Sequence, residues 1–266
     1  MRWLLITALV GFGCRPQHVK QHTCDKPIGG LATYLKPGAI VWFGEMHGTE
    51  ESPRFVGDAA CEAAKVAHVQ LGLEIPHAEQ PAFDRYLKSK GSDADRAALV
   101  AGPFWQQADG RSSLAMVALV ERVRVLRAAG APIDLVLYDD PTAGRDEAMA
   151  KMVMRLRDPK AIFVALSGNV HSRRTKGARW DPNLVPTVAH LVAAKLPVTT
   201  FNVSAAGGTL WACMSGPDEE PECGEHPNSN DGAGTPWTLG PPRDDAHDGV
   251  YFVGATQASY PAKQSR

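Results

Sequence analysis

The sequence predicts an α/β fold, with a mainly parallel sheet, helices on both faces and a loop-rich C-terminal insertion. Two observations predict it. Short runs of β-branched and aromatic residues alternate with longer segments whose apolar residues recur at helical spacing. Such alternation is typical of parallel strands joined by right-handed crossovers. With 266 residues, of which 44% are hydrophobic, the chain can bury one sizeable core, so we expect a single domain with insertions.

The strands are predicted from short apolar runs bounded by glycine, proline or polar residues. The first run, Ala39-Ile40-Val41-Trp42-Phe43, is β-branched and aromatic, and the second, at 68–75, ends at Pro76. Runs of the same kind predict strands at 133–138, 161–166, 198–203 and 249–255. Between 205 and 247 the composition shifts to Gly, Pro, Asp and Glu, which indicates loops with at most a short strand at 209–213.

The helices are predicted from apolar residues at helical spacing. Ser52-Pro53 is expected to supply an N-cap and a first helical position for a helix at 53–67. Further helices are expected at 77–90, 93–101, 112–129, 145–157 and 184–195. The helix at 112–129 has the strongest apolar stripe, and Gly130 follows it as a natural stop.

The N-terminus is predicted to be an export signal. Met1-Arg2 gives a positive start, an apolar run follows to Val10, and Gly11-Phe12-Gly13-Cys14 places small residues before a cysteine. The segment resembles a bacterial lipoprotein signal, which implies a protein lipid-anchored at Cys14 to the cell envelope, at the periplasmic face of the outer membrane. The alternative is a plain signal peptide cut elsewhere.

These features divide the chain into four segments. They are a signal peptide at 1–13, a lipidated tether and arm at 14–37, an α/β domain at 38–203, and a Gly/Pro-rich insertion with the last strand of the same domain at 204–266.

Four cysteines remain after Cys14, an even number in a protein expected to be exported. Cys213 and Cys223 flank a polar loop that a disulfide would close, and Cys24 and Cys61 would then pair by elimination. No Cys-x-x-Cys occurs, so neither a redox motif nor a zinc ribbon is indicated.

Charge and motif content exclude several functions. The net charge is -1 with no basic stripe, so nucleic acid is not an expected partner. No apolar run is long enough for a membrane-spanning helix, so contact with a membrane is expected through the lipid anchor only. The sequence contains no Gly-x-Ser-x-Gly, His-Glu-x-x-His or phosphate-binding glycine loop.

Two matching motifs carry the candidate chemistry. Gly44-Glu45-Met46-His47 and Gly168-Asn169-Val170-His171 each follow an apolar strand directly. Ligands collect at the carboxyl ends of parallel strands, so two histidines there can converge as a metal site or an acid/base pair. Either one alone is also compatible with an ordinary loop histidine.

Two more residues are candidates. Glu74 ends a mainly apolar strand, so partial desolvation is expected to raise its pKa and suit it to act as a general base. The alternative is a capping or salt-bridged glutamate. Arg145 lies in the first turn of a helix, against the macrodipole, and is expected either to stabilise an oxyanion or to form an ion pair with Asp139 or Asp140.

Together these residues resemble the superfamily of Tiki/TraB proteins, erythromycin esterases and ChaN proteins. The resemblance lies in the two Gly-x-x-His motifs, Gly72-Leu73-Glu74 and Arg145-Asp146-x-x-Met149-Ala150, and it covers about residues 38–203. The run from Glu79 to Leu87 is most similar to the ChaN branch of haem-binding lipoproteins.

The resemblance implies that His47, Glu74, Arg145 and His171 line one pocket with Glu45 beside them. In the esterase branch a carboxylate and histidines activate water without an evident metal. In the Tiki branch the paired histidines hold a divalent metal, which here implies Glu45, His47 and His171 as ligands. In the ChaN branch the cofactor is haem, which here implies His47 and His171.

Two functions follow as hypotheses. The first is an exported lipoprotein hydrolase that acts on an ester or amide in a small molecule or peptide, with Glu45, His47, Glu74, Arg145 and His171 as catalytic residues. The second is a haem- or iron-binding lipoprotein without catalytic activity. A domain that keeps the fold without chemistry is the remaining alternative.

Overall fold

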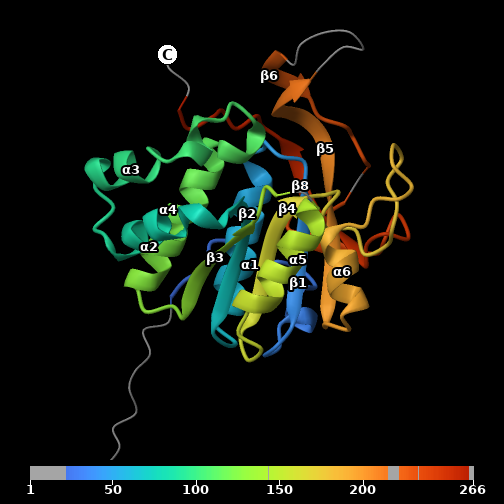
Figure 1. Cartoon of the computed structure of the whole chain (residues 1–266), viewed down its shortest axis with the longest axis horizontal. Coiled ribbons are helices and arrows are strands. Elements are labelled where there is room, and N and C mark those ends of the chain that lie inside the picture. Colours follow the sequence, from blue (N-terminus) through green and yellow to red (C-terminus); the bar gives the residue numbers. More distant parts are fainter. Residues whose placement is uncertain (1–21, 143, 215–221, 233, 264–266) are drawn as a thin grey trace, which may run out of the picture.

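The chain forms a mixed α/β fold with a mainly parallel central sheet (Figure 1), which confirms the expected fold class. The structure is a computed structural model that describes residues 22–142, 144–214, 222–232 and 234–263. The predicted signal peptide and Cys14 lie outside these residues. None of the helices in the described part is long and apolar enough to span a bilayer.

The sheet has the strand order β3-β2-β4-β1-β5-β8-β7, and β6 pairs with β5 beside this path. The strands are β1 (Ile40–Glu45), β2 (Val69–Pro76), β3 (Ile133–Asp139), β4 (Ile162–Gly168), β5 (Val198–Met214), β6 (Glu222–Pro227), β7 (Thr238–Gly240) and β8 (Gly249–Thr256). The strands from β3 to β8 in this order pair in parallel, whereas β7 and β6 are antiparallel to β8 and β5. The carboxyl ends of β1 to β4 therefore lie at one edge of the sheet.

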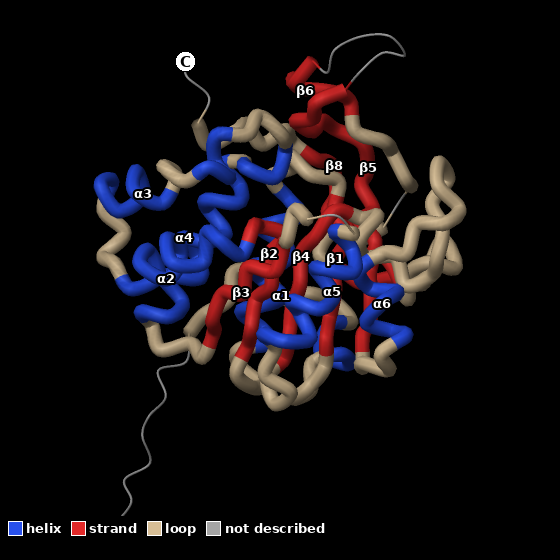
Figure 2. The backbone as a smooth tube through the Cα atoms, viewed as in Figure 1, coloured by secondary structure: helices blue, strands red, loops and turns tan. Residues whose placement is uncertain are grey.

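Helices cover both faces of this sheet (Figure 2). They are α1 (Glu51–Ala63), α2 (Gln80–Lys88), α3 (Asp93–Leu99), α4 (Leu114–Ala128), α5 (Arg145–Leu156) and α6 (Thr187–Ala193). Alternate residues of a strand point to opposite faces. Accordingly Phe43 packs in the larger core cluster with α1 and α4, and its neighbour Trp42 packs in the smaller one with α5 and α6.

The first helix begins earlier than its sequence signal predicts. Helix α1 starts at Glu51 with Glu50 at the N-cap position, so Ser52 is not the cap and Pro53 is not the first helical residue. The N–H groups of a first helical turn have no intrahelical acceptor, so a proline there costs no hydrogen bond. Pro53 thus marks the first turn but not its first position.

Strand β5 extends far beyond the strand predicted at 198–203. It continues to Met214, so the short strand considered at 209–213 is its distal part, which pairs with β6, and the loop expected from 205 onward is wrong up to that point. The pairing of β5 with β8 shifts register near Ala205 and Gly208, and Gly207 and Gly208 have φ of 77° and 112°. Such irregularities interrupt the two-residue alternation by which a strand is found in a sequence.

Both expected disulfides are present, Cys24–Cys61 and Cys213–Cys223. The first attaches the N-terminal arm to α1. Within the arm, Ile28 and Leu31 are buried in the larger core cluster, and Gly29 forms a β-bridge with Thr238. The described part of the predicted tether and arm is therefore packed on the α/β core.

Candidate active site

The two Gly-x-x-His motifs lie side by side. Strands β1 and β4 are adjacent and parallel, and Glu45 at the end of β1 pairs in register with Gly168 at the end of β4. The N–H of Asn169 donates to the carbonyl oxygen of Glu45 at 2.9 Å. The turns that carry His47 and His171 thus start from the same level of the sheet.

Each histidine contacts a carboxylate through its Nδ1 atom. His47 Nδ1 lies 2.8 Å from Glu45 Oε1, and His171 Nδ1 lies 2.7 Å from Asp146 Oδ1. Asp146 also accepts from the backbone N–H and the hydroxyl of Thr187, both at 2.7 Å. A carboxylate at Nδ1 favours the tautomer that carries its proton there, which leaves Nε2 with a lone pair.

Glu74 lies between the two imidazoles. Its carboxylate oxygens are 3.8 Å from His47 Nε2 and 3.7 Å from His171 Nε2. The side chain is nearly inaccessible to solvent, and Oε2 accepts the backbone N–H of Gly168 at 2.7 Å. Oε1 accepts from Arg145 Nη2 at 2.6 Å. Glu74 is therefore an immobilised carboxylate that both histidines face.

Arg145 connects the acidic residues of the site. Its Nε and Nη2 atoms donate to the two carboxylate oxygens of Asp139, each at 2.8 Å, so the ion pair considered from the sequence is present. Arg145 Nη1 lies 3.0 Å from His171 Nε2. A second arginine, Arg111, approaches less closely, with its Nη1 atom 3.5 Å from Glu74 and 3.6 Å from Asp139.

The pKa of Glu74 is shifted in the opposite direction from the one expected from the sequence. Burial raises this pKa, as expected, but the charges of His47, His171, Arg145 and Arg111 outweigh burial and lower it from 4.5 to about 2. The charged residues that lower this pKa come from segments of the chain that are distant from Glu74 in the sequence. Glu74 is therefore ionised at neutral pH, and the prediction that its pKa is raised is wrong, whereas its role as a general base stays a prediction.

The Glu45–His47 pair has the properties of a base. Burial raises the pKa of Glu45, and its Oε2 atom is buried without a hydrogen-bond partner among the described residues. Burial lowers the pKa of His47, but the hydrogen bond to Glu45 and the charge of Glu74 outweigh burial, so the net pKa lies above 6.5. Because Nδ1 of His47 contacts Glu45, the Nε2 atom of the neutral imidazole can accept a proton.

We expect the Glu74 network to make the protein sensitive to acid. The pKa of Glu74 is lowered on folding, so its ionised form contributes stability that is fully present above about pH 4.5 and is lost as the pH falls toward 2. Urea unfolding between pH 2 and pH 6 measures this. In Glu74→Gln, which has no charge to lose, the slope of stability against pH in that window should be smaller. An unchanged slope contradicts the assigned pKa.

A cavity of about 480 Å³ opens onto these groups. It is lined by His47, Glu74, Pro76, Gln107, Arg111, Asp139, Pro141, Arg145 and His171. Four of the five predicted site residues reach the cavity wall, and Glu45 lies behind His47. A volume of this order accommodates a small molecule or a short segment of a larger one.

Sequence reasoning missed two residues of the site. Asp146 follows Arg145 in the motif used for the resemblance, and that adjacency was the available signal for it. Arg111 comes from a short 3-10 turn at Gly110–Ser112, far from any predicted strand end. No pattern in the sequence indicates that this turn meets β1 and β2.

The donor set does not fit a metal held by Glu45, His47 and His171. Within the described residues, the group of three potential ligand atoms that lie within 4.8 Å of one another belongs to His22, Cys24 and Cys61, and these two cysteines form a disulfide. At the candidate site Glu45 contacts Nδ1 of His47 and so lies behind the imidazole, and the Arg145 guanidinium lies against His171 Nε2. A haem also fits poorly, because its macrocycle requires an apolar pocket and the wall of this cavity is largely charged.

The fold is similar to those of several solved proteins. An erythromycin esterase mutant in its open conformation matches with a TM-score of 0.58 at 14% identity over 73% of this chain and 78% of the esterase. A succinoglycan biosynthesis protein matches with 0.55 at 9% over 84% and 89%. A Bacillus cereus protein matches with 0.53 at 9% over 88% and 92%. No family model and no curated protein matches the sequence. At these identities the likeness shows the fold.

Proposed function

We propose that the protein is a hydrolase of the erythromycin-esterase type, which cleaves an ester or an amide with a water molecule activated by His47. The observation that carries this proposal is the Glu45–His47 pair, whose imidazole faces a buried carboxylate at the wall of a cavity. The shared fold with an erythromycin esterase supports it. As part of the same proposal, we assign the protein to the superfamily that the two Gly-x-x-His motifs resemble.

His47 is the proposed general base. Its Nδ1–H donates to Glu45, so Nε2 can take a proton from water as the water oxygen attacks the carbonyl carbon. The resulting imidazolium lies between Glu45 and the permanent carboxylate of Glu74, 3.8 Å away, and both stabilise it. When the tetrahedral intermediate collapses, the same proton passes to the leaving alkoxide or amine.

Arg111 is the best placed residue to bind the developing oxyanion. Arg145 uses its Nε and Nη2 atoms to hold Asp139 and Glu74. Arg111 binds Asp109 and Gln107 through Nε and Nη2, but its Nη1 atom makes only contacts of 3.5 and 3.6 Å with Glu74 and Asp139, so the N–H groups of Nη1 remain available for a substrate oxygen. Arg145 contributes charge and fixes Glu74, and His171 with Asp146 completes the wall. Electrostatic stabilisation of this kind is often the largest contribution to catalysis.

The test is hydrolysis of a panel of chromogenic esters and anilides by the purified protein, with metal analysis and a haem titration on the same sample. We expect ester or anilide turnover that persists after treatment with EDTA, since the donor set of Glu45, His47 and His171 does not fit a metal. Loss of turnover together with one equivalent of metal would establish the metal-dependent mechanism instead. A Soret band without turnover would favour the haem-binding alternative.

We also propose that the hydrolase acts at the cell envelope, attached by a lipid at Cys14. The signal-like N-terminus and the two disulfides, which are typical of exported proteins, support this. Metabolic labelling with a fatty acid should mark the wild-type protein and not Cys14→Ala. Equal labelling of both proteins would contradict attachment at this cysteine.

A further inference from the structure

The hairpin of β5 and β6 contacts both halves of the candidate site. Trp211 lies near the distal end of β5, and its side chain is only 6% exposed. Its backbone N–H donates to the carbonyl oxygen of Gly48 at 2.9 Å, directly after His47. Its indole Nε1–H donates to the carbonyl oxygen of Ala108 at 2.7 Å, three residues before Arg111. Trp211 thus contacts both the turn that carries His47 and the loop that carries Arg111.

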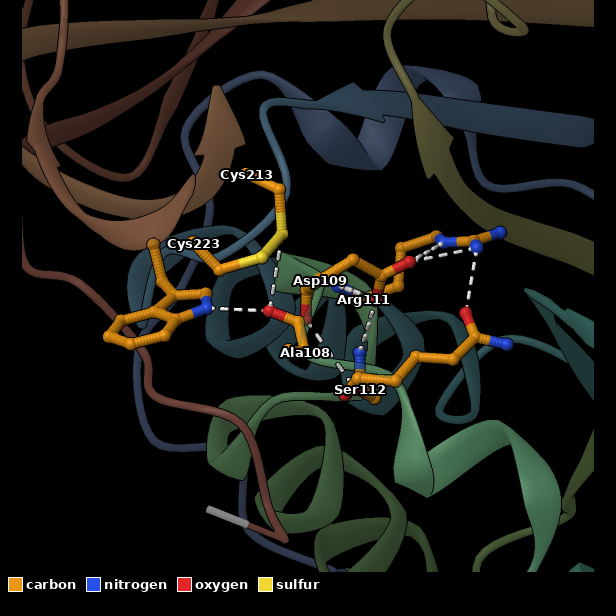
Figure 3. Close-up of a disulfide and its surroundings, with 8 residues drawn as sticks. Ala108, Asp109, Arg111, Ser112, Cys213 and Cys223 are labelled. Carbon is orange, nitrogen blue, oxygen red and sulfur yellow. Dashed lines mark hydrogen bonds and ion pairs between the residues drawn. A yellow bond between two sulfur atoms is a disulfide. The ribbon is translucent and has the colours of Figure 1, made fainter. Parts of the chain in front are cut away.

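Residues of the loop from Gln107 to Ser112 form hydrogen bonds with Arg111 (Figure 3). Asp109 accepts the backbone N–H of Arg111 at 3.1 Å and its Nε–H at 2.9 Å. Gln107 Oε1 accepts from Arg111 Nη2 at 3.0 Å. These contacts fix the guanidinium relative to its own loop. The hydrogen bond from Trp211 to the carbonyl oxygen of Ala108 attaches this loop to β5.

The two segments also pack directly on each other. A Cβ atom on Gly110 would lie 2.6 Å from Gly48 N and 2.7 Å from His47 C, so only glycine permits this approach. Gly48 itself has φ of 83°, and a Cβ there would lie against the carbonyl oxygen of Trp211. The His47 turn is therefore enclosed between Trp211 on one side and the Arg111 loop on the other.

The Cys213–Cys223 disulfide lies close to both Trp211 and the loop that carries Arg111. The two cysteines are paired residues of β5 and β6, two positions beyond Trp211, and Cys213 Sγ lies 3.6 Å from the Ala108 carbonyl oxygen (Figure 3). An isolated two-stranded hairpin is marginally stable in water. A covalent bond across its strands restricts the conformations open to the segment that contains Trp211.

We propose that Trp211 is a positioning residue, which sets the distance between His47 and Arg111 by holding both of their turns, and that the Cys213–Cys223 disulfide keeps it in place. The inference deepens the proposed hydrolase function, because it concerns the relative placement of the base and the oxyanion-binding arginine. Trp211 itself does not line the cavity.

The test uses Trp211→Phe, which keeps an aromatic ring against Tyr260 and removes the indole N–H. The matched control is Trp237→Phe, which also removes a buried indole N–H bond, from Trp237 to Asp58, away from the cavity. The first measurement is amide hydrogen exchange at 107–112. We expect about tenfold faster exchange in Trp211→Phe, as for the loss of one hydrogen bond of typical net strength, and no change at 107–112 in the control.

The second measurement is the pH dependence of kcat/KM. His47 is faced by Glu45, Glu74 and Arg111, and the Arg111 charge lowers its pKa. If Arg111 moves away, the pKa of His47 should rise, so the acid limb of the profile should move to higher pH and the rate on that limb should fall. A purely structural role would reduce activity without moving the limb, and the Trp237→Phe control should leave it in place.

The two measurements separate this inference from the proposed function. If the wild-type protein hydrolyses nothing, the proposed function fails, and amide exchange still decides whether Trp211 holds the loop. Equal exchange at 107–112 in Trp211→Phe and Trp237→Phe overturns the inference. To test the disulfide, we expect the double variant Cys213→Ser/Cys223→Ser to accelerate amide exchange at 107–112. Acceleration confined to β5 and β6 would contradict the proposal that the disulfide keeps Trp211 in place.

Discussion

Replacing His47 with glutamine is expected to lower kcat by about 10²- to 10⁴-fold, the range that a positioned general base contributes. Glutamine has a similar reach and can still donate a hydrogen bond to Glu45, but it cannot take a proton from water. In the wild-type protein the rate should fall as the pH drops through the pKa of His47, above 6.5, because the base must be neutral. Steady-state kinetics between pH 5 and pH 9 measure both effects.

The chain offers a matched control for this variant. His68 also contacts a carboxylate, with Nε2 2.8 Å from Asp134 Oδ2, and it directly precedes β2, at the end of the strand opposite Glu74. His68→Gln should retain wild-type activity and the wild-type pH profile. If His47→Gln and His68→Gln behave alike, His47 is not the base and the proposed mechanism fails.

Replacing Arg145 with methionine is expected to lower the free energy of unfolding by about 3–5 kcal/mol, the usual cost of removing one partner from a buried ion pair. Methionine fills a similar volume, but Glu74 and Asp139 then remain buried, 5% and 3% exposed, without their main cation. Urea denaturation at pH 7 measures the loss. The other contacts of Arg145 are with the site, so activity should fall as well.

Two further variants show whether charge causes this loss. Arg145→Lys keeps the charge but cannot bind Asp139 through two parallel bonds, so it should lose less stability than Arg145→Met. Adding Glu74→Gln to Arg145→Met removes one of the two carboxylates that lost their main cation and should recover part of the lost stability. Strict additivity of the two single changes would contradict direct coupling between Arg145 and Glu74.

The sequence predicted the sheet and the placement of its polar residues because both depend on local order. Apolar runs that end in Gly-Glu-Met-His and Gly-Asn-Val-His indicate where two strands finish, and parallel pairing then brings the ends together. The family resemblance, and not the order of the strands, implied that Glu74 and Arg145 line the same pocket. The sequence also predicted the second disulfide from a polar loop between two cysteines.

What the sequence did not predict depends on contacts between distant segments. Arg111 reaches Glu74 across 37 positions of chain from a short turn without periodicity, and Arg145 across 71. The pKa of Glu74 is lowered and not raised, because the charges of His47, His171 and the two arginines together outweigh burial. The length of β5 was missed because its glycines and register shifts remove the alternation that identifies strands.

The covalent link between Cys24 and Cys61 also has a mechanical consequence. Strand β1, the His47 turn and most of α1 lie inside the closed loop that this bond forms. Tension applied to the chain upstream of Cys24, as by an anchored N-terminus, passes through the sulfur atoms to Cys61 and bypasses the backbone between them. The protein can therefore be pulled from this end without stretching the segment that contains Glu45 and His47.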